Sequence, residues 1–197
     1  DDVLVISMTN GVSARENSNV KEVSERKISS LKAASILGFT WGECYDFNDN
    51  QMDSYPLLEI IRSIEKSKNK YCPTIVYTHS AADLNIDHRT VHNAVMTACR
   101  PFSSYFIKKI LTFENPSSTE WQSLSFNSYF KPNYFENIET HINKKIKAMK
   151  EYKTELKKWP HTRSLEFLNI LAKFRGAISG LKYAEAFFAE RIINIKK

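Results

Sequence analysis

Short apolar runs rich in β-branched residues alternate with longer segments of helical periodicity along the first 113 residues. Strands are predicted at residues 3–8, 41–47, 73–78 and 107–113. Helices are predicted at residues 22–37, 57–67 and 87–100. Because parallel strands need a long, usually helical, connection, this alternation predicts an α/β fold. We expect a Rossmann-like, three-layer α/β/α arrangement around a mainly parallel sheet.

The last third of the chain has a different pattern. A polar, aromatic loop is expected at 114–134, a long lysine-rich helix at about 135–156 and another helix at about 164–174. The segment 183–192, YAEAFFAERI, fits either a helix or a strand, and we expect a short edge strand.

Length and composition exclude several classes of protein. A chain of 197 residues fits one domain. No apolar run approaches the ~18 residues of a transmembrane helix, and no signal peptide is visible. The three cysteines, Cys44, Cys72 and Cys99, follow no disulfide or zinc-module pattern, so we expect reduced thiols in a cytoplasmic protein.

Net charge is +6, and much of the excess is local. Residues 144–158 carry seven lysines against two acids. Such a run could contact nucleic acid, but it contains no arginine and has few aromatic residues nearby. We therefore expect a solvated helix face and no nucleic-acid partner.

Ligands of open α/β sheets bind beyond the carboxyl ends of the strands. Three segments are expected there: 9–15, 48–50 and 78–88. The third, THSAADLNIDH, holds two histidines and two aspartates. The sequence contains no G-x-G-x-x-G, no P-loop and no G-x-S-x-G, whereas a metal site remains possible. His88 is the best candidate for a ligand of such a metal. The alternative is that His88 caps a helix and that His92 packs against the sheet.

The block THSAADLNIDHRTVHNAVMTACRP resembles the strand–loop–helix block of the PIG-L/LmbE-like family of zinc-dependent N-deacetylases. SERKISSLKAASILG resembles the arginine-led helix of that family. FENPSSTEW and WPHTRSLEFL resemble later blocks of a bacterial, bacillithiol-pathway-like subgroup. The resemblance covers nearly the whole chain in order.

This resemblance implies a catalytic Zn²⁺ with His88 among its ligands. The family's His-Pro-Asp-Asp block, which supplies two further ligands and the general base, is absent from this sequence. We therefore expect residues 1–197 to be a single LmbE-like domain that lacks its first strand and that block. A catalytic zinc normally takes three protein ligands and a water, so His88 alone is insufficient.

Many family members carry a histidine as general acid where this chain has Asn85. Asparagine is no proton donor near neutral pH, so we expect Asn85 to bind substrate. His79 and His161 are the candidate acids. The alternative for His79 is a structural hydrogen bond, and His161 is alternatively a substrate ligand. Asp87 is expected to orient an active-site group; alternatively, it is a carboxylate favoured by the helix dipole.

The resemblance places Arg26 at the position of the helix arginine that contacts substrate in the family. Arg163 is a second candidate for substrate binding. Each could bind a sugar hydroxyl or phosphate through its guanidinium group. The alternative for Arg26 is a surface ion pair with Glu22.

The function implied is zinc-dependent removal of an acetyl group from an N-acetylglucosamine-type sugar, in a glycoconjugate, a glycolipid or a thiol-sugar precursor. The expected partner is this small molecule, with a homo-oligomer possible. The alternative is a catalytically inactive LmbE-like scaffold or binding protein.

Overall fold

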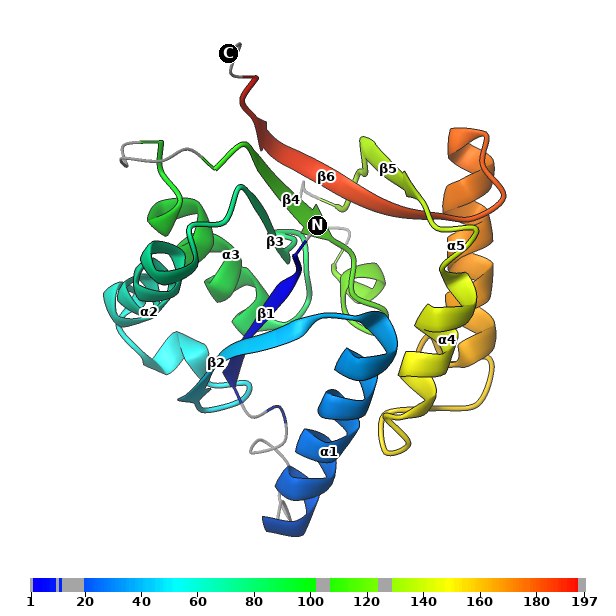
Figure 1. Cartoon of the computed structure of the whole chain (residues 1–197), viewed down its shortest axis with the longest axis horizontal. Coiled ribbons are helices and arrows are strands. Elements are labelled where there is room, and N and C mark those ends of the chain that lie inside the picture. Colours follow the sequence, from blue (N-terminus) through cyan, green and yellow to red (C-terminus); the bar gives the residue numbers. More distant parts are fainter. Residues whose placement is uncertain (1, 10, 12–19, 102–106, 124–128, 195–197) are drawn as a thin grey trace. The chain divides into compact units, whose positions relative to one another are not determined.

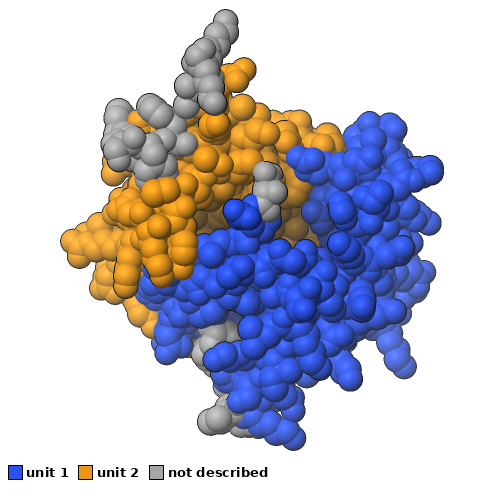
Figure 2. Space-filling model, viewed as in Figure 1, with its two compact units in different colours: residues 1–49, 136–185 blue, residues 50–135, 186–197 orange. Residues whose placement is uncertain are grey.

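The structure is a computed structural model that describes residues 2–9, 11, 20–101, 107–123 and 129–194. The chain divides into two compact units, which Figure 2 shows in different colours. Unit 1 comprises residues 1–49 and 136–185, and unit 2 comprises residues 50–135 and 186–197. Within the described residues, no helix is both long and apolar enough to cross a bilayer.

Unit 1 begins with a βαβ connection: β1 (Leu4–Thr9), α1 (Val20–Leu37) and β2 (Thr40–Phe47). The two strands pair in parallel, with Leu4 opposite Thr40. Gly38 adopts a left-handed φ of 84°, which ends α1 and turns the chain directly into β2. The unit also contains α4 (Ile142–Lys150) and α5 (Leu165–Ser179); α1 packs against α4, and α4 against α5 (Figure 1).

Unit 2 contains α2 (Leu57–Tyr71), β3 (Ile75–His79), α3 (Ile86–Ala98) and β4 (Lys109–Phe113). β3 and β4 pair in parallel along their whole length, from Ile75 opposite Lys109 to His79 opposite Phe113. In Figure 1, α2 and α3 lie side by side. A core of four buried residues joins α3 to β4: Val95, Cys99, Ile107 and Ile110.

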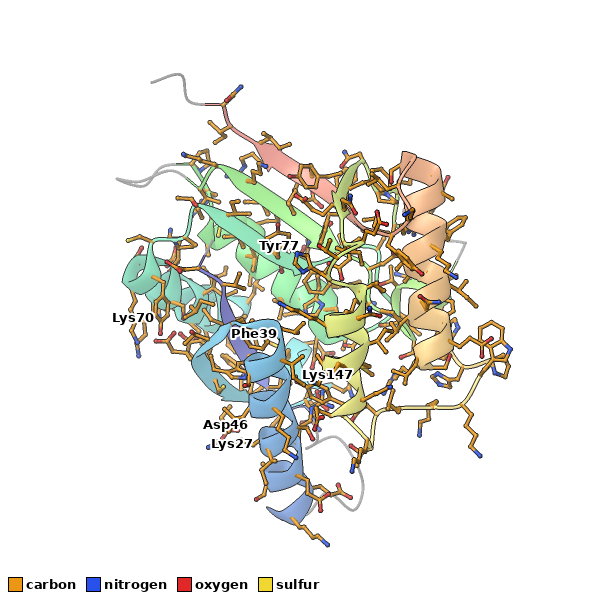
Figure 3. The ribbon with its side chains drawn as sticks, turned by 45° about the vertical axis from the view of Figure 1, so that its right-hand side comes forward. Lys27, Phe39, Asp46, Lys70, Tyr77 and Lys147 are labelled. Atoms are coloured by element: carbon orange, nitrogen blue, oxygen red, sulfur yellow. The ribbon has the colours of Figure 1, made fainter. Side chains whose placement is uncertain are left out.

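The α/β class is confirmed, and both βαβ connections were predicted. The expected parallel pairing is present in β1–β2 and β3–β4. The single sheet needs correction, because the described strands form two sheets: β1-β2, and a second of order β3-β4-β6-β5. β6 (Ala184–Ile192) is a strand, as expected, but it is not at an edge: it lies between β4 and β5 (Tyr134–Asn137) and runs antiparallel to β4. Aromatic packing across this sheet favours the interior position, since the ring of Phe187 meets that of Tyr77 on β3 edge-on. Figure 3 shows where Tyr77 lies.

The prediction of one long helix over residues 135–156 is wrong. Residues 134–137 form β5, and α4 covers only nine residues. Asn137 causes the break, because its side chain accepts a hydrogen bond from the Glu139 amide at 2.9 Å and closes a local turn. The lysine-rich pattern thus correctly predicted the helix α4. It did not predict the turn at Asn137 that precedes this helix.

Candidate functional site

The β3–α3 loop of unit 2 places most of the predicted site residues. Asn85 is the N-cap of α3, and its side-chain oxygen accepts from the Asp87 amide at 2.8 Å. This cap starts the helix at Ile86, so that His88 lies in its first turn. The carboxyl end of β3 and the amino end of α3 therefore meet at one loop, as ligand-binding loops of α/β folds do.

Asp83, in the middle of this loop, is completely buried and accepts hydrogen bonds from several groups. Its donors are the hydroxyls of Ser118 and Thr119, the latter at 2.7 Å, and the Asn85 amide at 2.9 Å. Its Oδ1 also lies 2.9 Å from Nδ1 of His88. Burial alone would raise the pKa of Asp83, but the hydrogen bonds from His88, Ser118 and Thr119, together with the charge of His88, lower it to about 2.

An ionised Asp83 fixes the tautomer of His88. A carboxylate can only accept, so Nδ1 of His88 carries the proton and donates it. Nε2 of a neutral imidazole is then the acceptor nitrogen. A buried carboxylate behind a histidine is the usual support of a metal-ligating imidazole, because it fixes both the ring orientation and the lone pair. The side chain of His88 is 17% exposed, so this nitrogen belongs to a partly accessible ring.

His79 stacks on His88 with ring centroids 4.0 Å apart and ring planes 1° from parallel. Its Nδ1 is buried and has no hydrogen-bond partner within the described part of the chain. Burial, and next the charge of His88, lower the pKa of His79 to about 3. His79 is therefore a neutral imidazole at pH 7. His92, whose Nδ1 lies 3.0 Å from the His79 carbonyl oxygen, packs against β3.

Asp87 makes contacts different from those of Asp83. Its carboxylate accepts from the amides of Asn50 at 2.6 Å and Met52 at 2.9 Å. The side-chain amide of Asn85 donates to Asn50 Oδ1 at 2.9 Å. Asp87 and Asn85 thereby tie the segment after residue 49 to the start of α3. Both predicted residues lie at the loop, and the structure shows them holding backbone in place.

Arg26, Arg163 and His161 come together in unit 1. Arg26 Nη1 lies 2.9 Å from Oε1 of Glu155, and Arg163 Nη1 donates to Oε2 of the same carboxylate at 2.7 Å. The Arg26 guanidinium also lies over the Tyr152 ring, 4.8 Å from its centroid. The Arg163 amide donates to Nδ1 of His161 at 3.0 Å. The ion pair that Arg26 makes is therefore with Glu155, and not the pair with Glu22 that was the alternative to substrate binding.

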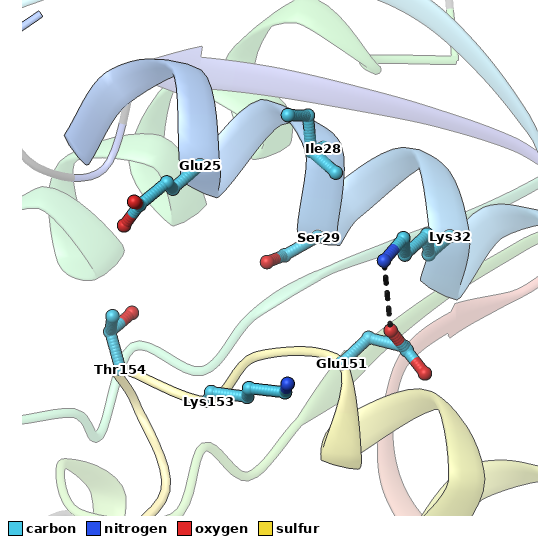
Figure 4. A pocket seen from close by; sticks show the side chains of 7 residues that line it. All are labelled: Glu25, Ile28, Ser29, Lys32, Glu151, Lys153 and Thr154. Atoms are coloured by element: carbon cyan, nitrogen blue, oxygen red, sulfur yellow. Dashed lines mark ion pairs between the residues drawn. The ribbon is translucent and has the colours of Figure 1, made fainter. Parts of the chain in front are cut away.

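A separate shallow pocket of about 180 Å³ lies in unit 1 between α1 and the segment after α4 (Figure 4). Its polar rim includes the ion pair of Lys32 with Glu151, whose Nζ and Oε2 are 3.8 Å apart. The lining contains no histidine or cysteine, and we assign it no function.

The described residues contain no group of three or more His, Cys, Asp or Glu side chains that could hold a metal ion. His88 therefore fits as one ligand but does not make a metal site by itself. Of the first predicted segment, Asn10 and residues 12–15 lie outside the described residues.

Sequence reasoning gave Asp83, Ser118 and Thr119 no role. Asp83 was visible as one of two aspartates in THSAADLNIDH, and both hydroxyls belong to the FENPSSTEW block. A buried carboxylate needs several donors, so the neighbouring serine and threonine were a signal. Their distance of 35 and 36 positions along the chain concealed it.

The PIG-L family profile, described as GlcNAc-PI de-N-acetylase, matches residues 1–99. The chain is also 30% identical over 158 residues to the uncharacterized deacetylase YaiS of Escherichia coli, covering 77% of this chain and 75% of that protein. This chain belongs to the PIG-L family. The predicted bacillithiol-pathway subgroup has no counterpart among these matches.

Solved structures share the fold of this PIG-L chain. The conserved protein TT1542 of Thermus thermophilus superposes with a TM-score of 0.77 at 16% identity, over 99% of this chain and 84% of that one. N,N'-diacetylchitobiose deacetylase of Pyrococcus horikoshii superposes with a TM-score of 0.73 at 19% identity, over 95% of this chain and 72% of that one. The zinc-inhibited form of teicoplanin deacetylase Orf2 superposes with a TM-score of 0.71 at 12% identity, over 95% of this chain and 86% of that one. At these identities the likeness shows the α/β fold.

Proposed function

We propose that this PIG-L family deacetylase removes the acetyl group from an N-acetylglucosamine-type sugar, with Zn²⁺ as its metal. The observation that carries the proposal is the pairing of buried Asp83 with Nδ1 of His88, which directs a metal-binding lone pair onto Nε2. The family description and the chitobiose deacetylase of the same fold support an acetylated amino sugar as substrate.

The metal would act as a Lewis acid and lower the pKa of a bound water. Three protein ligands are normal for such a zinc. The described residues offer His88 and no complete set, so we derive no step through the metal. The chain's own contribution is the fixed His88 imidazole, and the loop that Asp87 and Asn85 hold in place.

For the proton that the departing amine needs, His79 and His161 are the candidates. His79 stacks directly on His88, but its pKa of about 3 leaves it unprotonated at pH 7 and argues against a donor role; His161 accepts from the backbone beside Arg163. If His79 is the donor, His79→Ala should lower kcat by about 10²–10⁴ and flatten the alkaline limb of the pH–rate profile. If that limb disappears in His161→Ala alone, the donor is His161. A profile unchanged in both variants would remove both histidines from proton transfer.

The deacetylase proposal is tested by acetate release from N-acetylglucosamine and N,N'-diacetylchitobiose, with zinc added to metal-free protein. We expect His88→Ala to abolish both release and stoichiometric zinc binding while the circular dichroism spectrum stays unchanged. His141→Ala is the matched control, because His141 is an exposed histidine at the start of α4. Zinc content undiminished by His88→Ala would remove His88 from the ligand set.

The second candidate is a catalytically inactive binding protein with the same fold. The absence of a three-ligand group within the described residues favours it. It predicts sugar binding without acetate release at any zinc concentration, and this result in the assay above would replace the deacetylase proposal.

A further inference from the structure

Helix α5 presents three large apolar side chains at its surface: Ile170, Phe174 and Ile178 are 41%, 53% and 54% exposed. Their spacing of four residues places them within about 80° of one another around the helix and along about 12 Å of its length. The exposed apolar side chains of α1, by contrast, are spread over about half of its circumference: Val23, Ile28, Leu31 and Leu37. The three residues of α5, which we call the α5 stripe, therefore form one continuous apolar surface.

The opposite face of α5 anchors the helix in unit 1. Leu168, Ala172 and Gly176 are buried on that face. Ala172 packs in a cluster with Ile138 and Ile142. Because this face holds the helix in place, the α5 stripe is a fixed surface of the folded chain. An exposed and contiguous apolar surface of this kind usually marks an interaction site.

The order of side chains along the α5 stripe is the same in both directions from Phe174. One isoleucine lies four positions before this phenylalanine, and another lies four positions after it. A two-fold interface uses the same surface on both partners, so this surface has to complement itself. When a second α5 packs antiparallel on the first, Phe174 meets Phe174 of the other copy, and Ile170 meets Ile178.

The charges at the two ends of α5 are also complementary in this arrangement. Glu166 lies eight positions before Phe174 in the first turn of the helix, and Lys182 lies eight positions after it. Both are exposed, and antiparallel pairing places the glutamate of one copy beside the lysine of the other. Lys173 and Arg175 lie about 100° to either side of Phe174, so they flank such a pair without facing the stripe of the other copy. The apolar and the charged positions thus both fit a second copy of this chain.

We propose that α5 pairs antiparallel with the α5 of a second copy of this chain, about a two-fold axis that passes beside Phe174. Three half-exposed side chains supply less than the ~800 Å² that each partner of a stable complex buries. We therefore expect a reversible dimer whose population depends on the protein concentration. The proposal goes beyond the proposed deacetylase function, since it involves neither the β3–α3 loop nor a metal.

The first test is sedimentation velocity of the protein at concentrations from about 1 to about 200 µM. The average mass should rise from that of one chain towards that of two. Phe174→Ser changes a side chain that is already half exposed, so it should keep the circular dichroism spectrum and weaken the dimer at least about 10-fold. Leu58→Ser is the matched control, because Leu58 on α2 is 52% exposed, and it should leave the dimer unchanged. A monomer at every concentration would overturn the proposal.

Exchanging the end charges tests the antiparallel register. Glu166→Lys and Lys182→Glu should each weaken the dimer about 2- to 10-fold, because like charges then face each other at both ends of the pair. The double variant should recover the affinity of the wild type, since each facing pair again has opposite charges. A double variant as weak as the single ones would contradict antiparallel pairing.

Disulfide formation locates the two-fold axis. Cys44→Ser and Cys72→Ser first remove both exposed thiols. In this background Phe174→Cys should give a disulfide-linked dimer on mild oxidation, because the axis brings position 174 of the two copies together. Leu58→Cys in the same background should stay monomeric. A dimer that survives Phe174→Ser and gives no disulfide at position 174 uses another surface and overturns the proposal.

Discussion

The side chain of His88 shows how one buried carboxylate decides what an imidazole can do. Asp83 makes the Nδ1–H tautomer the favoured one, and we expect ¹⁵N NMR at pH 8 to show a protonated Nδ1 and an unprotonated Nε2. Asp83→Asn removes the charged acceptor and should convert His88 to a mixture of both tautomers. Asp53→Asn, at an exposed carboxylate, is the control. A His88 tautomer unchanged by Asp83→Asn would mean that another group fixes the ring.

The thiol of Cys99 should be inert in the native protein. Burial in the core between α3 and β4 raises the pKa of Cys99 to about 11, and only the thiolate reacts with alkylating reagents. We expect iodoacetamide at pH 8 to modify the exposed Cys44 and Cys72 and to spare Cys99 until denaturant is added. Peptide mass spectrometry measures this directly. Equal labelling of all three cysteines would show that this core opens readily.

At the level of single residues, the sequence indicated which side chains to consider, but not their partners. His88, Asn85 and Asp87 lie at one loop because strand, cap and helix follow each other within about ten residues. The role of Asp83 depends on Ser118 and Thr119, and that of Arg26 on Glu155. Contacts over such separations depend on the tertiary fold, which local patterns do not encode.

Among the elements, α3 is held at its start by Asp87. Asp87→Ala would leave the amides of Asn50 and Met52 without their acceptor, and one of these hydrogen bonds is fully buried. We expect a loss of about 2–3 kcal/mol in the free energy of unfolding by urea. Asp53→Ala, at an exposed carboxylate in the adjoining 3₁₀ helix, should change it by less than about 0.5 kcal/mol. Equal stability of the two variants would exclude Asp87 as a structural support and favour its predicted catalytic role.

The end of α5 gives a second prediction, which concerns backbone packing. A Cβ on Gly176 would lie 2.6 Å from the Leu181 carbonyl oxygen and 2.8 Å from the Lys182 carbonyl carbon. Backbone atoms cannot move aside cheaply, so Gly176→Ala should destabilise the protein by about 1–3 kcal/mol despite the better helix propensity of alanine. Ala177→Ser, which adds one atom at the neighbouring exposed position, is the control. A stabilised Gly176→Ala would contradict this close approach.

Elements with a strong hydrophobic periodicity could be predicted from the sequence. Elements for which a local turn or a distant strand competes with the local preference could not. The βαβ segments follow from apolar runs with helices between them. β5 was taken for part of a helix because the lysine-rich sequence around it suits a helix, while the turn at Asn137 overrides that preference. β6 was expected at an edge, but it lies inside the sheet because it pairs with β4, as Phe188 does with Thr112, 76 residues earlier in the chain.

On the scale of the whole molecule, each unit has a candidate residue near the carboxyl end of a parallel strand. Arg26 lies beside the end of β1 in unit 1. His79 ends β3 in unit 2, and the hydroxyls that hold Asp83 follow β4. One rule of α/β folds thus fits the positions of the candidate metal ligand and the candidate substrate-binding arginine, each within its own unit.

The two units should unfold together. The chain passes between them after residues 49, 135 and 185, and the last two crossings fall inside β5 and β6. Neither unit can lose its structure without breaking strands that continue into the other, so we expect unfolding to be cooperative. Scanning calorimetry should give one transition whose calorimetric and van 't Hoff enthalpies agree. The fluorescence of Trp41 in unit 1 and that of Trp121 in unit 2, followed in single-tryptophan variants, should change at the same urea concentration. Two separated transitions would instead make each unit an independent folding domain, and β5 and β6 would then be expected to fray at the division.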